Sequence, residues 1–103
     1  MTQRARMPQR RPCQTIKFKY RDNSYHLTVG YYDNDEPGEV FLNASKVGSD
    51  AAALARDGAV LISIALQHDV PVATMLDAIT RDQDGTPSTV VGAMLEQLVK
   101  VST

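Results

Sequence analysis

The spacing of apolar residues changes once along the chain, near residue 50, and this change constrains the fold more than any other feature. Before that point apolar and polar residues alternate, which is the period of a β-strand with one buried face. After it, apolar residues recur every three or four positions, as in an amphipathic helix. Strands followed by helices predict an α+β domain in which a three-stranded antiparallel sheet carries three helices on one face.

Three segments have the strand pattern, separated by polar turn-forming residues: 15–20, 25–32 and 39–42. In the first of them Ile16, Phe18 and Tyr20 share one face, which predicts that this face is buried. The polar break at 21–24 predicts that the first two strands form a β-hairpin. The acidic turn at 33–38 leads to the third strand, which we expect to pair antiparallel with the second.

Three helices are predicted after the strands: residues 50–69, residues 72–79 after Pro71, and a final helix that starts at 86–87 and runs through Leu98. The first is apolar on nearly every side, and its polar stripe is limited to Arg56, Ser63 and Gln67. We therefore expect it to be the buried central helix of the core. Gly58 inside this helix costs about 1 kcal/mol relative to alanine, which predicts close packing of a neighbouring element there. The Thr86-Pro87 pair predicts the N-cap and first residue of the last helix.

The length of 103 residues favours a single domain, which we place at residues 14–103. Chains of this size bury roughly 60–70% of their unfolded surface, so we expect nearly all apolar side chains to be used in joining helix to sheet, with no lined hollow where reactive groups could converge. A single cysteine, Cys13, cannot form an internal disulfide and favours the cytoplasm. The longest apolar stretch, 59–66, is too short to cross a bilayer, and residues 1–12 lack the apolar run of a signal peptide.

No grouping of reactive residues along the chain predicts catalysis. His26 falls on the outer face of its strand, His68 falls at a helix end, and Cys13 has no base beside it in sequence. The acidic turn never completes a calcium-loop pattern, and the isolated glycines form no phosphate-binding loop. We therefore predict no catalytic residue, no metal and no cofactor, and an isolated chain that is not an enzyme.

The first 12 residues carry arginines and no acidic residue, which leaves the rest of the chain acidic; the arginines are Arg4, Arg6, Arg10 and Arg11. One interpretation is a disordered basic arm over residues 1–13, with Pro8 and Pro12 opposing regular structure. The alternative is a polyanion- or nucleotide-binding module that uses these arginines together with Lys46. Four arginines make a small electrostatic footprint, so the first interpretation is favoured, and nucleic acid is a disfavoured partner.

Two neighbouring stretches, Gly38-Glu39-Val40-Phe41-Leu42-Asn43 and Lys46-Val47-Gly48-Ser49-Asp50, are the most specific sequence feature. With further similarity at 61–63, 69–72, 84–88 and Gly92, the chain resembles the TSCPD domain over roughly residues 14–98. That module is the C-terminal domain of adenosylcobalamin-dependent ribonucleotide reductases and also exists as small stand-alone proteins. The chain departs from the family's Thr-Ser-Cys-Pro-Asp stretch, because residues 86–90 contain no cysteine. A metal or redox role for that cysteine is therefore not available here.

The resemblance implies a stand-alone accessory or regulatory domain that binds a ribonucleotide reductase or a related protein, without performing the reaction. The candidate partner-binding residues follow the third strand and the loop after it: Gly38, Glu39, Phe41, Asn43, Lys46, Gly48 and Asp50. An alternative of about equal weight is that these residues only form a strand-to-helix corner, with the glycines supplying unusual backbone angles. The free edges of a three-stranded sheet also favour pairing between copies of the chain.

Overall fold

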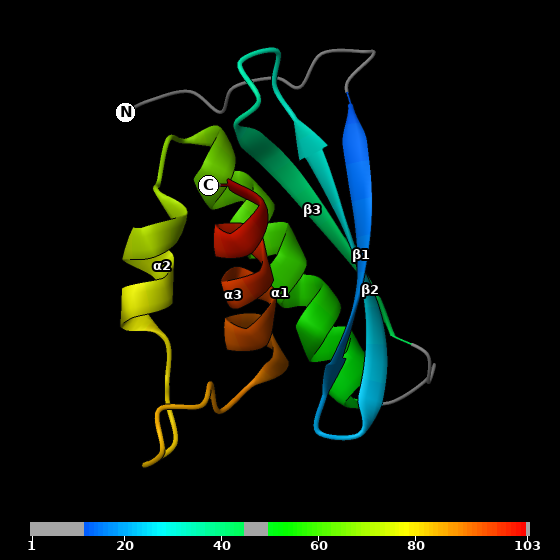
Figure 1. Cartoon of the computed structure of the whole chain (residues 1–103), viewed down its shortest axis with the longest axis vertical. Coiled ribbons are helices and arrows are strands. Elements are labelled where there is room, and N and C mark those ends of the chain that lie inside the picture. The colour runs from blue at the N-terminus through cyan, green and yellow to red at the C-terminus, as the bar shows by residue number, and fades with distance from the viewer. Residues whose placement is uncertain (1–11, 45–49, 103) are drawn as a thin grey trace.

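The computed structural model describes residues 12–44 and 50–102, and its elements follow the predicted order (Figure 1). The strands are β1 (Cys13–Tyr20), β2 (Asn23–Tyr31) and β3 (Pro37–Ala44), and the helices are α1 (Asp50–Gln67), α2 (Val72–Ala78) and α3 (Val90–Ser102). The α+β class and the three-stranded antiparallel sheet are therefore confirmed. None of the helices in the described residues is long and apolar enough to cross a membrane.

The sheet has the order β1-β2-β3, and both pairings are antiparallel. The turn between β1 and β2 contains only Arg21 and Asp22, with φ angles of 47° and 66°. Two consecutive left-handed residues give a turn whose twist matches that of the flanking strands. The pairing of Tyr20 with Asn23 therefore begins sooner than predicted, and Asn23 and Ser24 belong to β2 rather than to the turn.

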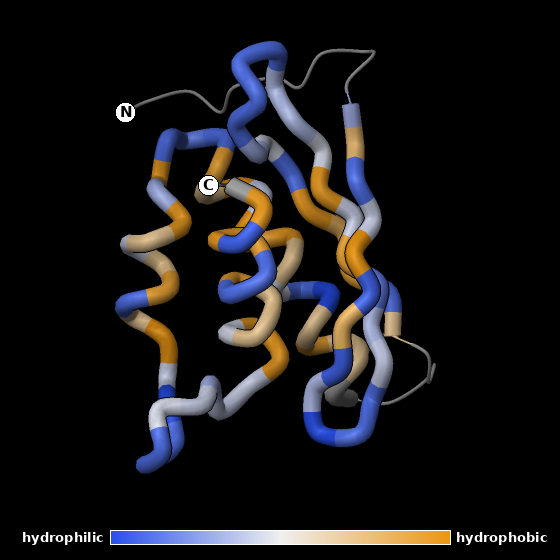
Figure 2. The backbone as a smooth tube through the Cα atoms, in the orientation of Figure 1, coloured by the Kyte–Doolittle hydropathy of each residue, from blue (hydrophilic) through white to orange (hydrophobic). Residues whose placement is uncertain are grey.

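All three helices lie on one side of the sheet, as Figure 1 shows. Helix α1 packs along β3, α3 lies beside α1, and α2 packs against α3. The hydropathy colouring in Figure 2 shows apolar residues on the strands and on all three helices. The largest fully buried side chains come from the sheet and from α3: Leu27, Val29, Val40, Met94, Leu95 and Leu98. The rings of Phe18 and Tyr25 stack within this core at a centroid distance of 5.5 Å.

The orientation of α1 differs from the prediction. Ser63 and Gln67, expected on an outward polar stripe, are 7% and 4% exposed. Three large apolar residues of the same helix are instead open to solvent: Leu54 is 69% exposed, Val60 56% and Leu61 67%. The expectation of a helix buried on all sides was therefore wrong.

Hydrogen bonds to the free edge of β3 explain the burial of these polar residues. The backbone N–H of Val40 donates to Ser63 Oγ at 2.9 Å, and Gln67 Nε2 donates to the carbonyl oxygen of Gly38 at 2.9 Å. Gly38 and Val40 are two residues apart, so their backbone groups point to the same side of the strand. Helix α1 therefore occupies the place of a fourth strand along this edge, which protects it from pairing with other chains.

The contact between α1 and α3 confirms the prediction made from Gly58. A Cβ atom at this position would lie 2.6 Å from Cγ2 of Val91. Only a residue without a side chain lets the two helices approach this closely.

The start of α3 was predicted three residues too early. Pro87 pairs with Arg81 in an isolated antiparallel bridge, and the helix begins at Val90. Thr89, rather than Thr86, lies at the N-cap, and its Oγ1 accepts a hydrogen bond from the backbone N–H of Gly92 at 3.4 Å.

Candidate functional site

The partner-binding residues predicted on β3 divide between the two sides of the strand. Glu39, Phe41 and Asn43 share the outer face of the sheet, where Glu39 is half-buried, Asn43 is exposed and Phe41 is 52% exposed. Gly38 is buried, and its carbonyl oxygen accepts the bond from Gln67. The structure therefore brings three of the predicted residues together on a face that no described helix covers (Figure 1).

The remaining predicted site residues fall mostly outside the described residues: Lys46, Gly48, Arg4, Arg6, Arg10 and Arg11. Asp50 begins α1, but its side chain is likewise outside the description. The alternative anion-binding site, which depended on the arginines and Lys46, therefore stays a prediction.

Phe41 lies beside polar residues on the outer face of the sheet. It pairs with Thr28, whose hydroxyl lies 3.1 Å from that of Thr15 on β1. In the next row of the sheet, Asn43 pairs with His26, which in turn pairs with Lys17. An exposed aromatic side chain with polar neighbours is typical of a small protein-binding surface.

The residues with reactive side chains lie on different elements. His26 is exposed on β2, Cys13 is exposed at the start of β1, and His68 is half-buried just after α1. Among residues 12–44 and 50–102, no group of three or more His, Cys, Asp or Glu side chains could hold a metal ion.

Burial raises the pKa of the Tyr31 hydroxyl, which donates to Gln14 Oε1 at 3.1 Å.

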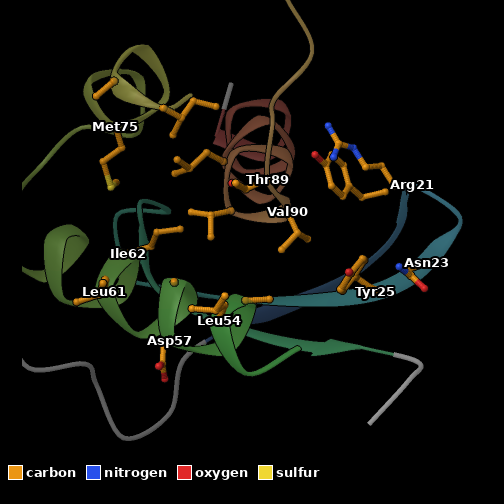
Figure 3. A pocket seen from close by; sticks show the side chains of 17 residues that line it. Arg21, Asn23, Tyr25, Leu54, Asp57, Leu61, Ile62, Met75, Thr89 and Val90 are labelled. Atoms are coloured by element: carbon orange, nitrogen blue, oxygen red, sulfur yellow. The ribbon is translucent and has the colours of Figure 1, made fainter. Parts of the chain in front are cut away.

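An apolar groove of about 850 Å³ opens on the helical side of the molecule (Figure 3). Its walls come from the end of the β1–β2 hairpin, the outward side of α1, and the facing parts of α2 and α3. Aliphatic and aromatic side chains form most of the lining, among them Leu54, Leu61, Met75, Ile79, Val90, Val91, Tyr20 and Tyr25. The expectation that nearly all apolar side chains are used in joining helix to sheet was therefore wrong, although the reactive residues His26, His68 and Cys13 do not line this groove.

The sequence contained a signal for this groove in the apolar residues on every side of α1. The sheet and α3 can cover only part of a helix, so Leu54 and Leu61 on the remaining side are left as a wall of the groove. From the sequence alone these residues are assigned to the core, because a helix that is apolar on all sides is normally buried.

Polar contacts close one end of the groove by joining the hairpin to the loop before α3. The hydroxyl of Tyr20 donates to the carbonyl oxygen of Pro87 at 2.7 Å. Arg21 donates to Asp82 Oδ2 at 2.8 Å, and its guanidinium lies 5.1 Å from the centre of the Tyr20 ring. Asp57 lies on the other side of the groove in Figure 3, and no ion pair reaches it among the described residues.

This arrangement is suited to binding an apolar surface. The ionisable side chains of the lining are two tyrosines, Arg21 and Asp57, which lie at its edges. A groove with apolar walls and charges at its margins is typical of recognition sites.

The chain is similar to known proteins along most of its length. The model of the TSCPD domain family matches residues 2–101. A vitamin B12-dependent ribonucleotide reductase of Bradyrhizobium diazoefficiens is 32% identical over 80 residues, which are 78% of this chain and 6% of the reductase. The reductase of Streptantibioticus cattleyicolor is 35% identical over 77 residues, or 75% of this chain and 13% of that protein. No solved structure matches.

The matched segment is thus a small part of each of these reductases, and the chain spans far less than their whole length. The match of the family model covers nearly the whole chain, including all three strands and all three helices of the described residues. The chain belongs to the TSCPD domain family.

Proposed function

We propose that this chain is an accessory domain of deoxyribonucleotide metabolism that acts by binding a protein, a vitamin B12-dependent ribonucleotide reductase. The family match and the similarity to reductases support this context. The observation that carries the proposal is the exposed ring of Phe41 on a sheet face that no described helix covers. Catalysis stays with the reductase, and we propose no cofactor for this chain.

The proposed contact surface consists of Glu39, Phe41 and Asn43. Phe41 supplies the apolar anchor, because an aromatic side chain that loses its remaining exposure in a contact contributes far more than its polar neighbours. Asn43 and Glu39 lie on either side of it along the strand; Asn43 is exposed and offers an amide to a partner, and Glu39 is half-buried. The loop residues Lys46 and Gly48 follow this strand in sequence and remain part of the proposed surface. A cytoplasmic location, as the single cysteine favours, belongs to the same proposal.

The test is a direct binding measurement between the purified chain and a B12-dependent reductase from the same organism. We expect Phe41→Ala to weaken binding at least about tenfold, the effect of about 1.4 kcal/mol. Thr74→Ala is the control, because Thr74 is exposed on α2, on the other side of the sheet, and does not line the apolar groove. Circular dichroism establishes that both variants fold.

Two results would count against the proposal. In the first, the wild-type chain binds no reductase at concentrations where the protein is soluble. In the second, Phe41→Ala folds normally and binds as tightly as the wild type, which would remove the proposed surface.

A further inference from the structure

We propose that the apolar groove is covered by a second copy of this chain, so that the protein is a homodimer joined through this groove. The sequence favoured pairing of copies at the sheet edges, but α1 already occupies the edge of β3 through Ser63 and Gln67. The groove lies on the helical side of the sheet, away from Phe41, so the proposal does not depend on reductase binding.

The exposure of apolar residues on α1 indicates that something covers this helix. Leu54, Val60 and Leu61 are 69%, 56% and 67% exposed, although leucine and valine are among the residues most often buried. Single exposed apolar residues are normal on a protein surface. Leu54 and Leu61 both lie in the wall of an apolar groove, and an exposed apolar patch of this kind marks a protein interface.

The outward side of α1 has the spacing of a helix–helix contact. Leu54, Asp57, Leu61 and Ile64 follow one another at intervals of three, four and three residues, which places them along a single stripe. Leucines lie on both sides of Asp57 in this stripe. Leu54 and Leu61 are therefore presented together to whatever enters the groove.

The charges at the margins of the groove make this surface complementary to itself. Arg21 and Asp57 lie on opposite sides of the groove in Figure 3. A two-fold axis through the groove exchanges its two sides, so Arg21 of each copy comes next to Asp57 of the other. Arg21 already binds Asp82, but its guanidinium has five N–H donors and its side chain is 57% exposed, so it can also reach a second carboxylate.

A second copy therefore supplies apolar side chains for the walls of the groove, a cation for Asp57, which forms no ion pair with a described residue, and a further anion for Arg21. An unrelated protein or a small apolar molecule would have to match these features separately. Mutual matching of one surface with itself is the defining property of a two-fold dimer interface.

Sedimentation velocity of the full chain over a concentration series tests the proposal. We expect a species of twice the 11.3 kDa monomer mass. Leu61→Glu should raise the dimer dissociation constant at least about 100-fold, because it buries an unpaired charge in the interface. Leu61 is 67% exposed in one chain, so this variant should fold, which circular dichroism checks. Lys17→Glu, a charge change on the exposed outer face of β1, is the control and should leave the dimer intact.

A charge exchange tests the pairing of Arg21 with Asp57. Arg21→Asp and Asp57→Arg should each weaken self-association about tenfold by placing like charges together. An equimolar mixture of the two variants should restore the dimer, because each copy then meets the opposite charge. Asp82→Asn removes only the ion pair within the chain and should leave dimerisation unchanged.

The proposal is overturned if the wild type stays monomeric throughout the series, which would leave the groove to another protein or to a small apolar molecule. It is also overturned if Leu61→Glu dimerises as the wild type does. If the equimolar mixture of Arg21→Asp and Asp57→Arg dimerises no better than either variant alone, Arg21 does not pair with Asp57 of the other copy. Binding of the monomeric Leu61→Glu variant to the reductase separates the two proposals, since that contact is assigned to Phe41.

Discussion

The side chain of Ser63 on α1 binds both backbone polar groups of Val40 on β3. The N–H of Val40 donates to Ser63 Oγ at 2.9 Å, and the hydroxyl lies 3.0 Å from the carbonyl oxygen of Val40. The hydroxyl also lies 2.9 Å from the carbonyl oxygen of Ala59, so its single proton serves one of these two acceptors at a time. A helix side chain thereby replaces the neighbouring strand that the edge of β3 lacks.

Removing this hydroxyl should destabilise the fold. We expect Ser63→Ala to lower the free energy of unfolding by about 1–3 kcal/mol, because the Val40 N–H stays buried without its acceptor. Urea unfolding followed by circular dichroism measures the change. Ser24→Ala on β2 is the control and should change stability by less than about 0.5 kcal/mol. Equal effects of the two substitutions would mean that the contact with β3 contributes nothing.

The packing of α3 on Gly58 predicts an unusual response to alanine. In an open helix Gly→Ala adds about 1 kcal/mol of stability, but here the new methyl group would lie 2.6 Å from Cγ2 of Val91. Because a β-branched valine has little freedom to rotate away, we expect Gly58→Ala to destabilise by about 1–3 kcal/mol. In a Val91→Ala background the same substitution should become neutral or stabilising. A penalty of the same size in both backgrounds, measured by urea unfolding, would contradict this account.

The position of the α3 N-cap can be tested with two threonines. Thr89 Oγ1 accepts the bond from the Gly92 N–H, so Thr89→Ala should cost about 1 kcal/mol of stability. Thr86, the cap expected from the sequence, lies in the exposed loop before the helix, and Thr86→Ala should cost less than about 0.5 kcal/mol. If Thr86→Ala lowers the thermal midpoint more than Thr89→Ala does, the helix starts at Thr86 instead.

The pKa of Asp84 predicts a pH dependence of the loop that precedes α3. Hydrogen bonds from the side chain and backbone of Thr86 hold the pKa of this exposed carboxyl below its ordinary value, the backbone N–H lying 2.9 Å from Oδ1. A lowered pKa in the folded state stabilises the loop above the unfolded-state value of about 3.9, and this contribution is lost as the pH falls through the folded value. A carboxyl NMR titration should find the midpoint low in the wild type and closer to ordinary in Thr86→Ala. Identical midpoints in the two proteins would refute the role of Thr86.

The sequence by itself determined the class of the fold and the order of its elements. The alternation in residues 15–42 and the helical spacing after residue 50 are local patterns of apolar residues. These patterns decide whether each segment forms a strand or a helix. Gly58 also predicted the close approach of another element, because a glycine inside a helix lowers its stability and close packing offsets this loss. Phe41 and Asn43 were placed on one face by the two-residue period of the strand.

Only the tertiary structure decided which side of α1 faces the sheet. A helix with apolar residues on all sides can be turned in several ways, and its local pattern does not distinguish them. The unpaired backbone of Gly38 and Val40 makes the choice, because buried N–H and C=O groups need partners and Ser63 and Gln67 supply them. That choice turns Leu54 and Leu61 outward and so creates the groove, which depends on residues far apart in the sequence.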